Sequence, residues 1–358
     1  MKTEYILILV IAFAIGFTIV FTHGHTNTEN STEIKGSKTP SVTLTKEEKA
    51  LKFDRYKEIS NPSGFVNTNN LPITIGQYIG KKVILLDFVT YSCINCQRTF
   101  PYLVDWYKKY EDKGLVIIGI HTPEFAFEHE KQNVEKAMKE FGITFPIVLD
   151  NDYGTWNAYG NQYWPRKYLI DIDGYVVYDH IGEGKYDETE AKIVELLNER
   201  AQRLQETNVS VIPSSVDAIQ PTLTSQESPE TYIGSDRSEY QYTGTGTVPK
   251  DHYALRGTWT SHAEYKELTS TTGSIVYHFS AKMVHLVAEA TTPIEATVYL
   301  DGKSIASDVS GEDVHNGKII FNEARLYTLV NFTNQASEHT VEIKFEHPGV
   351  KAYAFTFS

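Results

Sequence analysis

The chain has 358 residues, of which 41% are hydrophobic, so it is long enough for two folded domains with substantial cores. Its formal net charge is −13, from 46 acidic and 33 basic residues. Nucleic acids and anionic membrane surfaces bind basic surfaces, and this charge therefore excludes both as partners.

An apolar segment opens the chain, within residues 1–22. Lys2 precedes seventeen residues, Tyr5 to Phe21, of which only Thr18 is clearly polar. This run exceeds the core of a usual signal peptide, and no clear small-residue cleavage site follows it. We therefore expect a membrane anchor that stays attached, with a cleaved signal sequence as the alternative. Either segment places the rest of the chain outside the cytoplasm, at the cell surface or in a periplasm, or secretes it after cleavage.

Two polar segments divide the remaining chain. Residues 23–50 are rich in Thr, Asn, Ser and charged side chains without apolar periodicity, which predicts a flexible linker. Residues 208–230 contain three prolines and many hydroxyl side chains, which predicts a second linker. The two domains are therefore expected at residues 51–207 and 231–358.

The first of these domains alternates between strands and helices. Continuous apolar runs typical of buried strands lie at 82–91, 114–122 and 146–150. Helical periodicity covers 96–113, 127–142 and 187–204. Residues 166–182 predict a hairpin that turns at Asp173 and Gly174. Buried strands interleaved with helices indicate an α/β sheet in which the first strand and its helix belong to a parallel connection.

The second domain has no long helical pattern. Short alternating segments, rich in aromatic and β-branched residues, lie at 274–290, 295–306, 318–332 and 339–357. Asp301 and Gly302 predict a two-residue hairpin turn. The pattern is typical of an all-β sandwich or jelly roll. Its aromatic residues either stack on sugar rings or, as is usual in small sandwiches, pack in the core; they include Trp259, Tyr253, Tyr265, Tyr277 and Tyr299.

The only two cysteines, Cys93 and Cys96, lie where the first buried strand gives way to a helix. A zinc site needs about four ligands and this pair supplies two, and no histidines stand at ligand spacing. A structural disulfide across two residues would remove little entropy from the unfolded chain. The N-terminus of a helix stabilises a thiolate, which favours a redox couple. We expect Cys93 to attack and Cys96 to resolve the mixed disulfide.

The segment "LLDFVTYSCINCQRTFPYL" resembles the active-site segment of thioredoxins. The resemblance implies a central strand, a redox turn and a helix. It also implies that Asp87 is the buried acid that moves protons to and from Cys96, and that Pro101 is the proline within the helix. A carboxylate in so apolar a strand is costly to bury, which independently predicts a raised pKa for Asp87. Ile-Asn replaces the Gly-Pro of thioredoxins between the cysteines, so no redox potential is implied.

A broader resemblance covers almost the whole exported part. It rests on the segments "GFVNTNNLPIT", "GIHTPEFAFE", "DNDYGTWNAYGNQYWP", "YLIDIDGYVVY" and "GEGKYDETE", and on the ending "KAYAFTFS". These are similar to the soluble portion of DipZ-type proteins, within the TlpA and redoxin group. The resemblance implies a thioredoxin-like domain followed by a sandwich similar to carbohydrate-binding modules. This sequence has no multi-span electron-conducting part, so a separate membrane electron donor is expected.

The resemblance also assigns residues around the cysteines. Pro165 stands before a strand, where the family carries a cis-proline facing the thiols, and the backbone of Trp164 would pair with an extended substrate. Tyr91, Trp156, Tyr159 and Trp164 are interpreted as an aromatic rim that recognises substrates, with ordinary packing as the alternative. In the segment "HTPEF" at 121–125, His121 and Glu124 are expected to be structural.

These observations predict an enzyme, an extracytoplasmic thiol:disulfide oxidoreductase that needs no cofactor beyond the Cys93–Cys96 pair. Its partners are expected to be thiols and disulfides of exported proteins. The resemblance to the TlpA group favours reduction, for example of apocytochrome during cytochrome c biogenesis, with oxidation as the alternative. A second hypothesis is a glycan or cell-wall binding protein whose thioredoxin-like domain is a scaffold. A copper or peroxide protein is a third, and it lacks evident ligand histidines.

Overall fold

The structure is a computed structural model that describes residues 44–358, except 70, 211, 213–215, 217–226 and 334–335. The described residues belong to one unit of the chain, Thr43–Ser358. The expected anchor at 1–22 and most of both expected linkers lie outside the described residues. No helix within the described part of the chain is long and apolar enough to cross a membrane.

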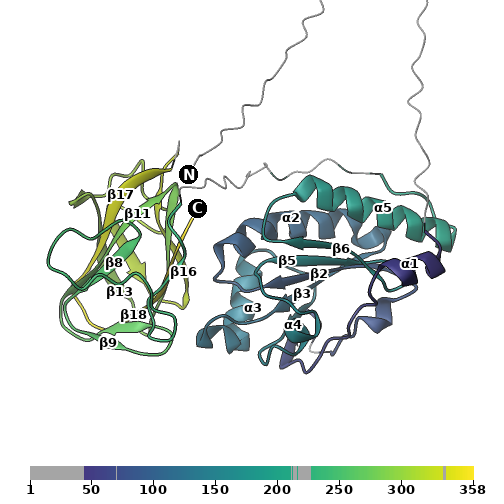
Figure 1. The fold of residues 1–358 in the computed structure, drawn as a ribbon, viewed down its shortest axis with the longest axis horizontal. Helices are drawn as coiled ribbons and strands as arrows, with labels where there is room; N and C mark the ends of the chain where they lie inside the picture. The colour runs from purple at the N-terminus through teal and green to yellow at the C-terminus, as the bar shows by residue number, and fades with distance from the viewer. Residues whose placement is uncertain (1–43, 70, 211, 213–215, 217–226, 334–335) are drawn as a thin grey trace, which may run out of the picture. The chain divides into compact units, whose positions relative to one another are not determined.

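A six-stranded mixed sheet forms the centre of the first domain (Figure 1). The strand order is β1-β4-β3-β2-β5-β6, with β2, β3 and β4 parallel and the other pairings antiparallel. The strands are β1 Gly64–Val66, β2 Val83–Val89, β3 Leu115–His121, β4 Ile147–Leu149, β5 Arg166–Ile170 and β6 Val176–Ile181. The α-helices are α1 Lys46–Lys52, α2 Ile94–Tyr110, α3 Lys131–Glu140, α4 Gly154–Ala158 and α5 Tyr186–Leu204. Short 3-10 helices lie at Gly76–Tyr78, Glu111–Lys113 and Ala126–His129.

Both faces of this sheet are buried, because successive strand residues point to opposite sides. On β2, Leu85 packs with α2, α3 and α5, while Leu86 packs on the opposite face with Trp156 of α4. All seven residues of β2 and of β3 are buried. The predicted parallel α/β core is confirmed, as is the hairpin at 166–182, which pairs β5 with β6.

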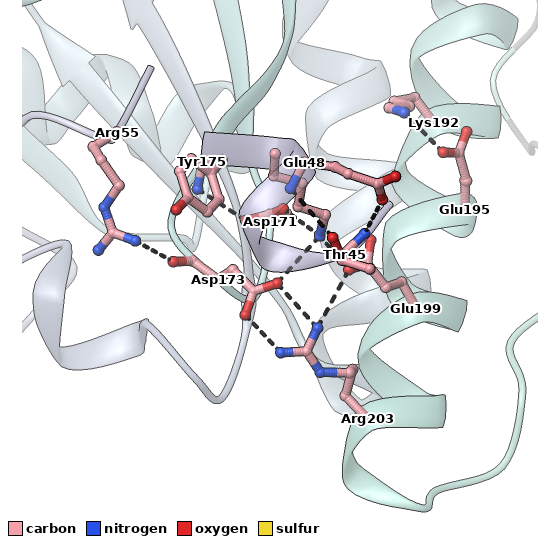
Figure 2. A network of polar contacts seen from close by, with 11 residues as sticks. Thr45, Glu48, Arg55, Asp171, Asp173, Tyr175, Lys192, Glu195, Glu199 and Arg203 are labelled. Atoms are coloured by element: carbon pink, nitrogen blue, oxygen red, sulfur yellow. Dashed lines mark hydrogen bonds and ion pairs between the residues drawn. The ribbon is translucent and has the colours of Figure 1, made fainter. Parts of the chain in front are cut away.

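Helix α1 is held to the domain by a buried ion cluster. Lys49 lies 2.7 Å from Asp171 and 3.2 Å from Asp173, and it also binds Glu199 of α5. Figure 2 shows these carboxylates converging, with Arg203 reaching Asp173 from α5. Residues 46–50 were expected to belong to the linker, and this boundary is wrong, because the folded domain already includes them. The polar composition of this segment gave no indication that Lys49 is buried, with only 3% of its surface exposed.

The second domain consists of two antiparallel sheets (Figure 1). One has the order β16-β12-β18-β10-β9, with β7 also paired to β18, and the other has the order β14-β13-β17-β11-β8, with β15 also paired to β13. The first six strands are β7 Thr231–Tyr232, β8 His252–Arg256, β9 Trp259–Ser261, β10 Lys266–Leu268, β11 Gly273–Ala281 and β12 Met283–Ala290. The last six are β13 Ile294–Leu300, β14 Lys303–Ser304, β15 Lys318–Phe321, β16 Arg325–Asn331, β17 Ser337–Phe345 and β18 Val350–Phe357.

Side chains from both sheets form one core, which confirms the predicted sandwich. Phe355 of β18 packs on Tyr277 of β11, with ring centroids 5.0 Å apart. Tyr277 and Tyr253 are fully buried, so both are core residues rather than sugar platforms. The predicted turn at Asp301 and Gly302 joins β13 to β14, and both turn residues have positive φ, as this hairpin type requires.

Loops near the cysteines also contact the sandwich. The Phe125 ring packs edge-on against Tyr353 of β18, with centroids 5.2 Å apart. The Tyr91 hydroxyl donates to the Ala324 carbonyl at 3.1 Å, and the Ala126 N–H donates to the Glu264 carboxylate at 2.8 Å. These contacts join segments far apart in the sequence, and no local pattern predicts them.

Candidate active site

Cys93 and Cys96 lie at the start of α2, directly after β2. Cys93 is the N-cap residue, with φ −80° and ψ 119°, and is half-buried, whereas Cys96 is fully buried. Both are free thiols. Cys93 makes no capping bond with its side chain, so the N–H groups of the first helical turn are available to a thiolate there. The structure places the pair at the strand-to-helix junction that the sequence predicts.

The two thiols differ in their surroundings. Burial raises the pKa of the Cys96 thiol well above its ordinary value, and hydrogen bonding and charge at Cys93 and the charge of Asp87 raise it further. A hydrogen bond with the Thr90 backbone acts in the opposite direction. Cys96 is therefore protonated at neutral pH, and it needs a base before it can act as a nucleophile.

Asp87 and Lys167 form a fully buried pair between β2 and β5. They are direct cross-strand partners, and the Lys167 Nζ lies 3.9 Å from the Asp87 Oδ1. Neither carboxylate oxygen of Asp87 has a hydrogen-bond partner among the described residues. Burial raises the pKa of Asp87 to about 7, although the charge of Lys167 opposes the rise. Asp87 is thus partly ionised at neutral pH, as a base for Cys96 requires.

Lys167 is a functional candidate that the sequence analysis missed. Burial lowers the pKa of its ammonium group, against the charges of Asp87 and Cys96. Its Nζ also donates to the Gly182 carbonyl at 3.3 Å. Its signal in the sequence was a lysine followed directly by the apolar residues Tyr, Leu and Ile of the same strand. Only the antiparallel register of β5 with β2 reveals that this lysine faces Asp87.

The peptide bond between Trp164 and Pro165 is cis, as the family resemblance implied. The Trp164 carbonyl oxygen lies 4.0 Å from the Cys93 Sγ. The indole Nε1 of Trp164 donates to the Thr122 carbonyl at 3.1 Å, which fixes this residue to the end of β3. Trp164 therefore lies beside the exposed thiol, where its backbone is in reach of a bound substrate.

A buried carboxylate, Glu128, supports the residue before Cys93. One of its oxygens accepts hydrogen bonds from the N–H and the hydroxyl of Ser92, at 3.2 and 2.7 Å. The other accepts from the N–H groups of Glu124 and Phe125, at 2.6 and 3.0 Å. Burial raises the pKa of Glu128, against these hydrogen bonds. The sequence analysis missed this residue, whose signal was an acid within the apolar segment "FAFE".

Three of the four aromatic residues expected at the rim, Tyr91, Trp156 and Tyr159, do not line the cavity that reaches Cys93. Tyr91 and Trp156 are 3% and 7% exposed, and neither lines the cavity that reaches Cys93. Tyr91 stacks on His121, and Trp156 packs on Trp164 with ring centroids 4.4 Å apart. Tyr91 and Trp156 therefore contribute to packing around the site, which is the alternative given for them above. Only Trp164 lines that cavity.

The structural roles expected for His121 and Glu124 can be described in detail. His121 is fully buried, and burial lowers its pKa to about 3, so its ring is neutral. Glu124 accepts a hydrogen bond from Tyr232 at 2.7 Å and pairs with Arg237 at 2.9 Å. Both partners of Glu124 belong to the sandwich side, so this acid joins the redox domain to its neighbour.

Among the described residues, one group of acids, histidines or cysteines is close enough to share a metal ion. It consists of Asp171, Asp173 and Glu199, and it includes neither cysteine. The ammonium group of Lys49 already lies among these three carboxylates. Lys49 and Arg203 thus offset two of the three negative charges.

Two thiols at a strand-to-helix turn, a neighbouring cis-proline and a buried acid together define a thioredoxin-like redox protein. Residues 34–197 match the Redoxin family, and residues 228–358 match a family described as the thioredoxin like C-terminal domain. The chain belongs to the redoxin group of thioredoxin-like thiol-disulfide oxidoreductases.

Particular relatives span both domains or the first alone. The chain is 35% identical over 318 residues to Protein DipZ of Mycobacterium tuberculosis, which covers 84% of this chain and 42% of DipZ. It is 32% identical over 126 residues to the thiol-disulfide oxidoreductase ResA of Bacillus subtilis, covering 35% of this chain and 67% of ResA. A crystal structure described as thiol:disulfide interchange protein DsbE from Chlorobium tepidum aligns at 22% identity with a TM-score of 0.36, covering 40% of this chain and 96% of that structure. The chain spans less than half the length of DipZ.

Proposed function

We propose that this protein exchanges disulfides with exported proteins, with Cys93 as the attacking thiol. The observation that supports this most strongly is the difference in burial between the two thiols. Cys93 is half-buried at the N-terminus of α2, whereas Cys96 is fully buried one turn further along the helix. The Cys93 thiolate attacks one sulfur of a substrate disulfide, and the other substrate sulfur leaves as a thiolate. The product is a mixed disulfide between Cys93 and the substrate.

Cys96 completes the reaction. Asp87 takes the proton from the Cys96 thiol, and the resulting thiolate attacks the Cys93 sulfur of the mixed disulfide. The second substrate sulfur leaves, and the Cys93–Cys96 disulfide forms. Two electrons have passed from the dithiol to the substrate, so a further reductant must restore the protein. Lys167 keeps part of the Asp87 population ionised, because its charge opposes the effect of burial on that pKa.

The direction, location and partners belong to this proposal. The apolar segment within residues 1–22 supports an anchored, extracytoplasmic protein or, after cleavage, a secreted one. The similarity to the thiol-disulfide oxidoreductase ResA supports exchange with thiols and disulfides of proteins. Reduction of disulfides in exported proteins, with a membrane protein as electron donor, is the direction that we propose. The sandwich then holds the enzyme near a glycan, the cell wall or a protein partner.

The test uses two single substitutions in the full chain. Cys93→Ser is expected to abolish reduction of a disulfide substrate such as insulin. Cys96→Ser is expected to retain the first attack and to accumulate mixed disulfides in cells, visible on non-reducing gels and identified by mass spectrometry. Turnover that persists in Cys93→Ser would refute the assignment.

A binding protein with an inactive scaffold is not favoured. Such a protein has no need for a buried acid and lysine behind a pair of free thiols, yet Asp87 and Lys167 are both fully buried there. Replacing both cysteines by serine separates the two functions, since a scaffold would keep its biological role without them.

A further inference from the structure

A cavity of about 250 Å³ reaches Cys93, and both domains line it. Cys93 and Trp164 come from the redox domain. Glu230, Tyr232 and Phe357, from residues 228–358, line it as well. This volume is below the roughly 300–1,000 Å³ of cavities that enclose a drug-sized ligand. It is still large enough for a cystine half with its immediate neighbours.

The cavity has an excess of negative charge. Its only charged lining residues, among those described, are Glu124 and Glu230. Arg237 pairs with Glu124 at 2.9 Å and stacks on the Tyr232 ring, 3.7 Å from its centroid. The Tyr232 hydroxyl lies 2.7 Å from Glu124 and 3.1 Å from Glu230. A hydroxyl has one proton to donate, so it satisfies one carboxylate at a time.

Arg237 pairs with Glu124, so Glu230 has no cation of its own among the described residues. Within the same part of the chain its hydrogen-bond partner is Tyr232, and its surface remains accessible to solvent. Although part of its surface reaches solvent, the protein packed around Glu230 and the charge of Glu124 raise its pKa to about 7, so Glu230 is mostly ionised at pH 8. A positive group on a substrate would relieve this imbalance while its sulfur faces Cys93.

We infer that the sandwich supplies a substrate-selecting wall over Cys93, and that Glu230 selects disulfides in short or extended segments with a cationic group beside the sulfur. The inference rests on the proposed exchange reaction and names its substrate class. Glu230 acts through charge and takes no part in bond making. In the exchange, Cys93 displaces one thiol of the probe and Cys96 then displaces the other, as in the proposed reaction above.

The test compares three small disulfides of similar size and different charge at pH 8 and low salt. They are cystamine, which is cationic, bis(2-hydroxyethyl) disulfide, which is neutral, and dithiodiglycolate, which is anionic. Rates of oxidation of the fully reduced protein are followed by stopped-flow tryptophan fluorescence. Each rate in a variant is divided by the wild-type rate for the same probe, which cancels the intrinsic reactivity of the disulfide.

Glu230→Gln is expected to slow oxidation by cystamine roughly tenfold, to leave the rate with the neutral probe unchanged and to accelerate oxidation by dithiodiglycolate. These differences in rate should be smaller in 0.5 M salt. Glu230→Lys should extend the same trend. Glu346→Gln and Glu346→Lys are matched controls on an exposed acid outside the cavity lining, and they should leave all three ratios near one.

Equal effects of Glu230→Gln on all three probes, or no effect, would overturn the charge-selecting role. A different result would contradict the proposed exchange reaction itself. In that case none of the three probes would oxidise the wild-type protein, or Cys93→Ser would still react at the wild-type rate.

Discussion

The carboxylate of Asp87 and the ammonium group of Lys167 face each other across β2 and β5, 3.9 Å apart and fully buried. Their separation is longer than a hydrogen bond, so each group keeps much of the cost of burial. The pair is therefore responsive to protonation. Asp87 titrates near neutrality, and Cys96 lies close enough for the charge of Asp87 to raise its pKa.

Replacing Asp87 should change how stability depends on pH. Its pKa is about 7 in the folded protein and 3.8 as the ordinary value, so the folded state holds this proton more tightly. The associated stabilisation is complete below about pH 4 and is lost as the pH rises through 7. Asp87→Asn should remove this decline, by up to about 4 kcal/mol between pH 4 and 8. Urea unfolding of the reduced protein at several pH values measures it.

The control for this measurement is Asp308→Asn, on an exposed acid of the sandwich, which should keep the wild-type pH dependence. The same decline in Asp87→Asn as in the wild type would contradict a raised pKa at Asp87.

Lys167→Gln should alter the chemistry rather than substrate binding. Without the nearby positive charge, the pKa of Asp87 rises further, and less of it is ionised at neutral pH. The release of substrate from the mixed disulfide should then require a pH higher by about 1 unit or more. Quench-flow measurement of release between pH 6 and 9 gives the profile. Lys108→Gln, on the exposed side of α2, should leave it unchanged; an unshifted profile in Lys167→Gln would exclude the proposed role.

Alkylation should distinguish the two thiols. Cys96 is fully buried and its pKa is raised, whereas Cys93 is half-buried. In the reduced native protein at pH 7.5, iodoacetamide should modify Cys93 at least tenfold faster than Cys96. Peptide mapping after a second, isotope-labelled reagent under denaturing conditions reports both rates. Equal rates in the native protein would be incompatible with the proposed roles, and equal rates in 6 M guanidinium chloride are the expected control.

Glu128→Gln should loosen the segment before Cys93. A glutamine side chain has one acceptor oxygen, so it cannot accept bonds from both Ser92 and the N–H groups of Glu124 and Phe125. The loss of unfolding free energy should be about 1–3 kcal/mol. Denaturant unfolding measures this loss, and Glu130→Gln, at an exposed acid two residues away, should cost far less. Equal stability of the two variants would show that the four bonds do not hold this loop.

Lys49→Met should weaken the attachment of α1. It would leave Asp171, Asp173 and Glu199 close together without their central cation, and breaking such a buried ion pair costs about 3–5 kcal/mol. Thermal unfolding compared with Lys46→Met, at an exposed lysine of the same helix, measures the difference. A smaller effect at Lys49 than at Lys46 would mean that the cluster does not stabilise the domain.

Much of the fold could be predicted because its signals are local. The apolar residues on both sides of Asp87 in β2 and the Asp-Gly turns at 173–174 and 301–302 are signals that depend on neighbouring residues only. The cis bond before Pro165 came from family resemblance, since a proline at the start of a strand has several local explanations.

What escaped prediction depends on contacts between distant segments. Lys167 becomes the partner of Asp87 only through strand register, and Glu128 meets Ser92 across 36 positions of sequence. For Tyr91 and Trp156 the sequence allowed either a position at the rim or ordinary packing, because an aromatic residue beside a motif can face either way. In the structure Tyr91 packs on His121 and Trp156 packs on Trp164, and both partners come from other segments of the chain.

Pro165, directly before β5, and Lys167 within it lie on the same side of the extended backbone, because they are two positions apart. A slip of β5 by a single residue against β2 would turn Lys167 away from Asp87 and displace Trp164 from Cys93 together. An error in the register of β5 against β2 would thus impair the redox chemistry while leaving both cysteines unaltered.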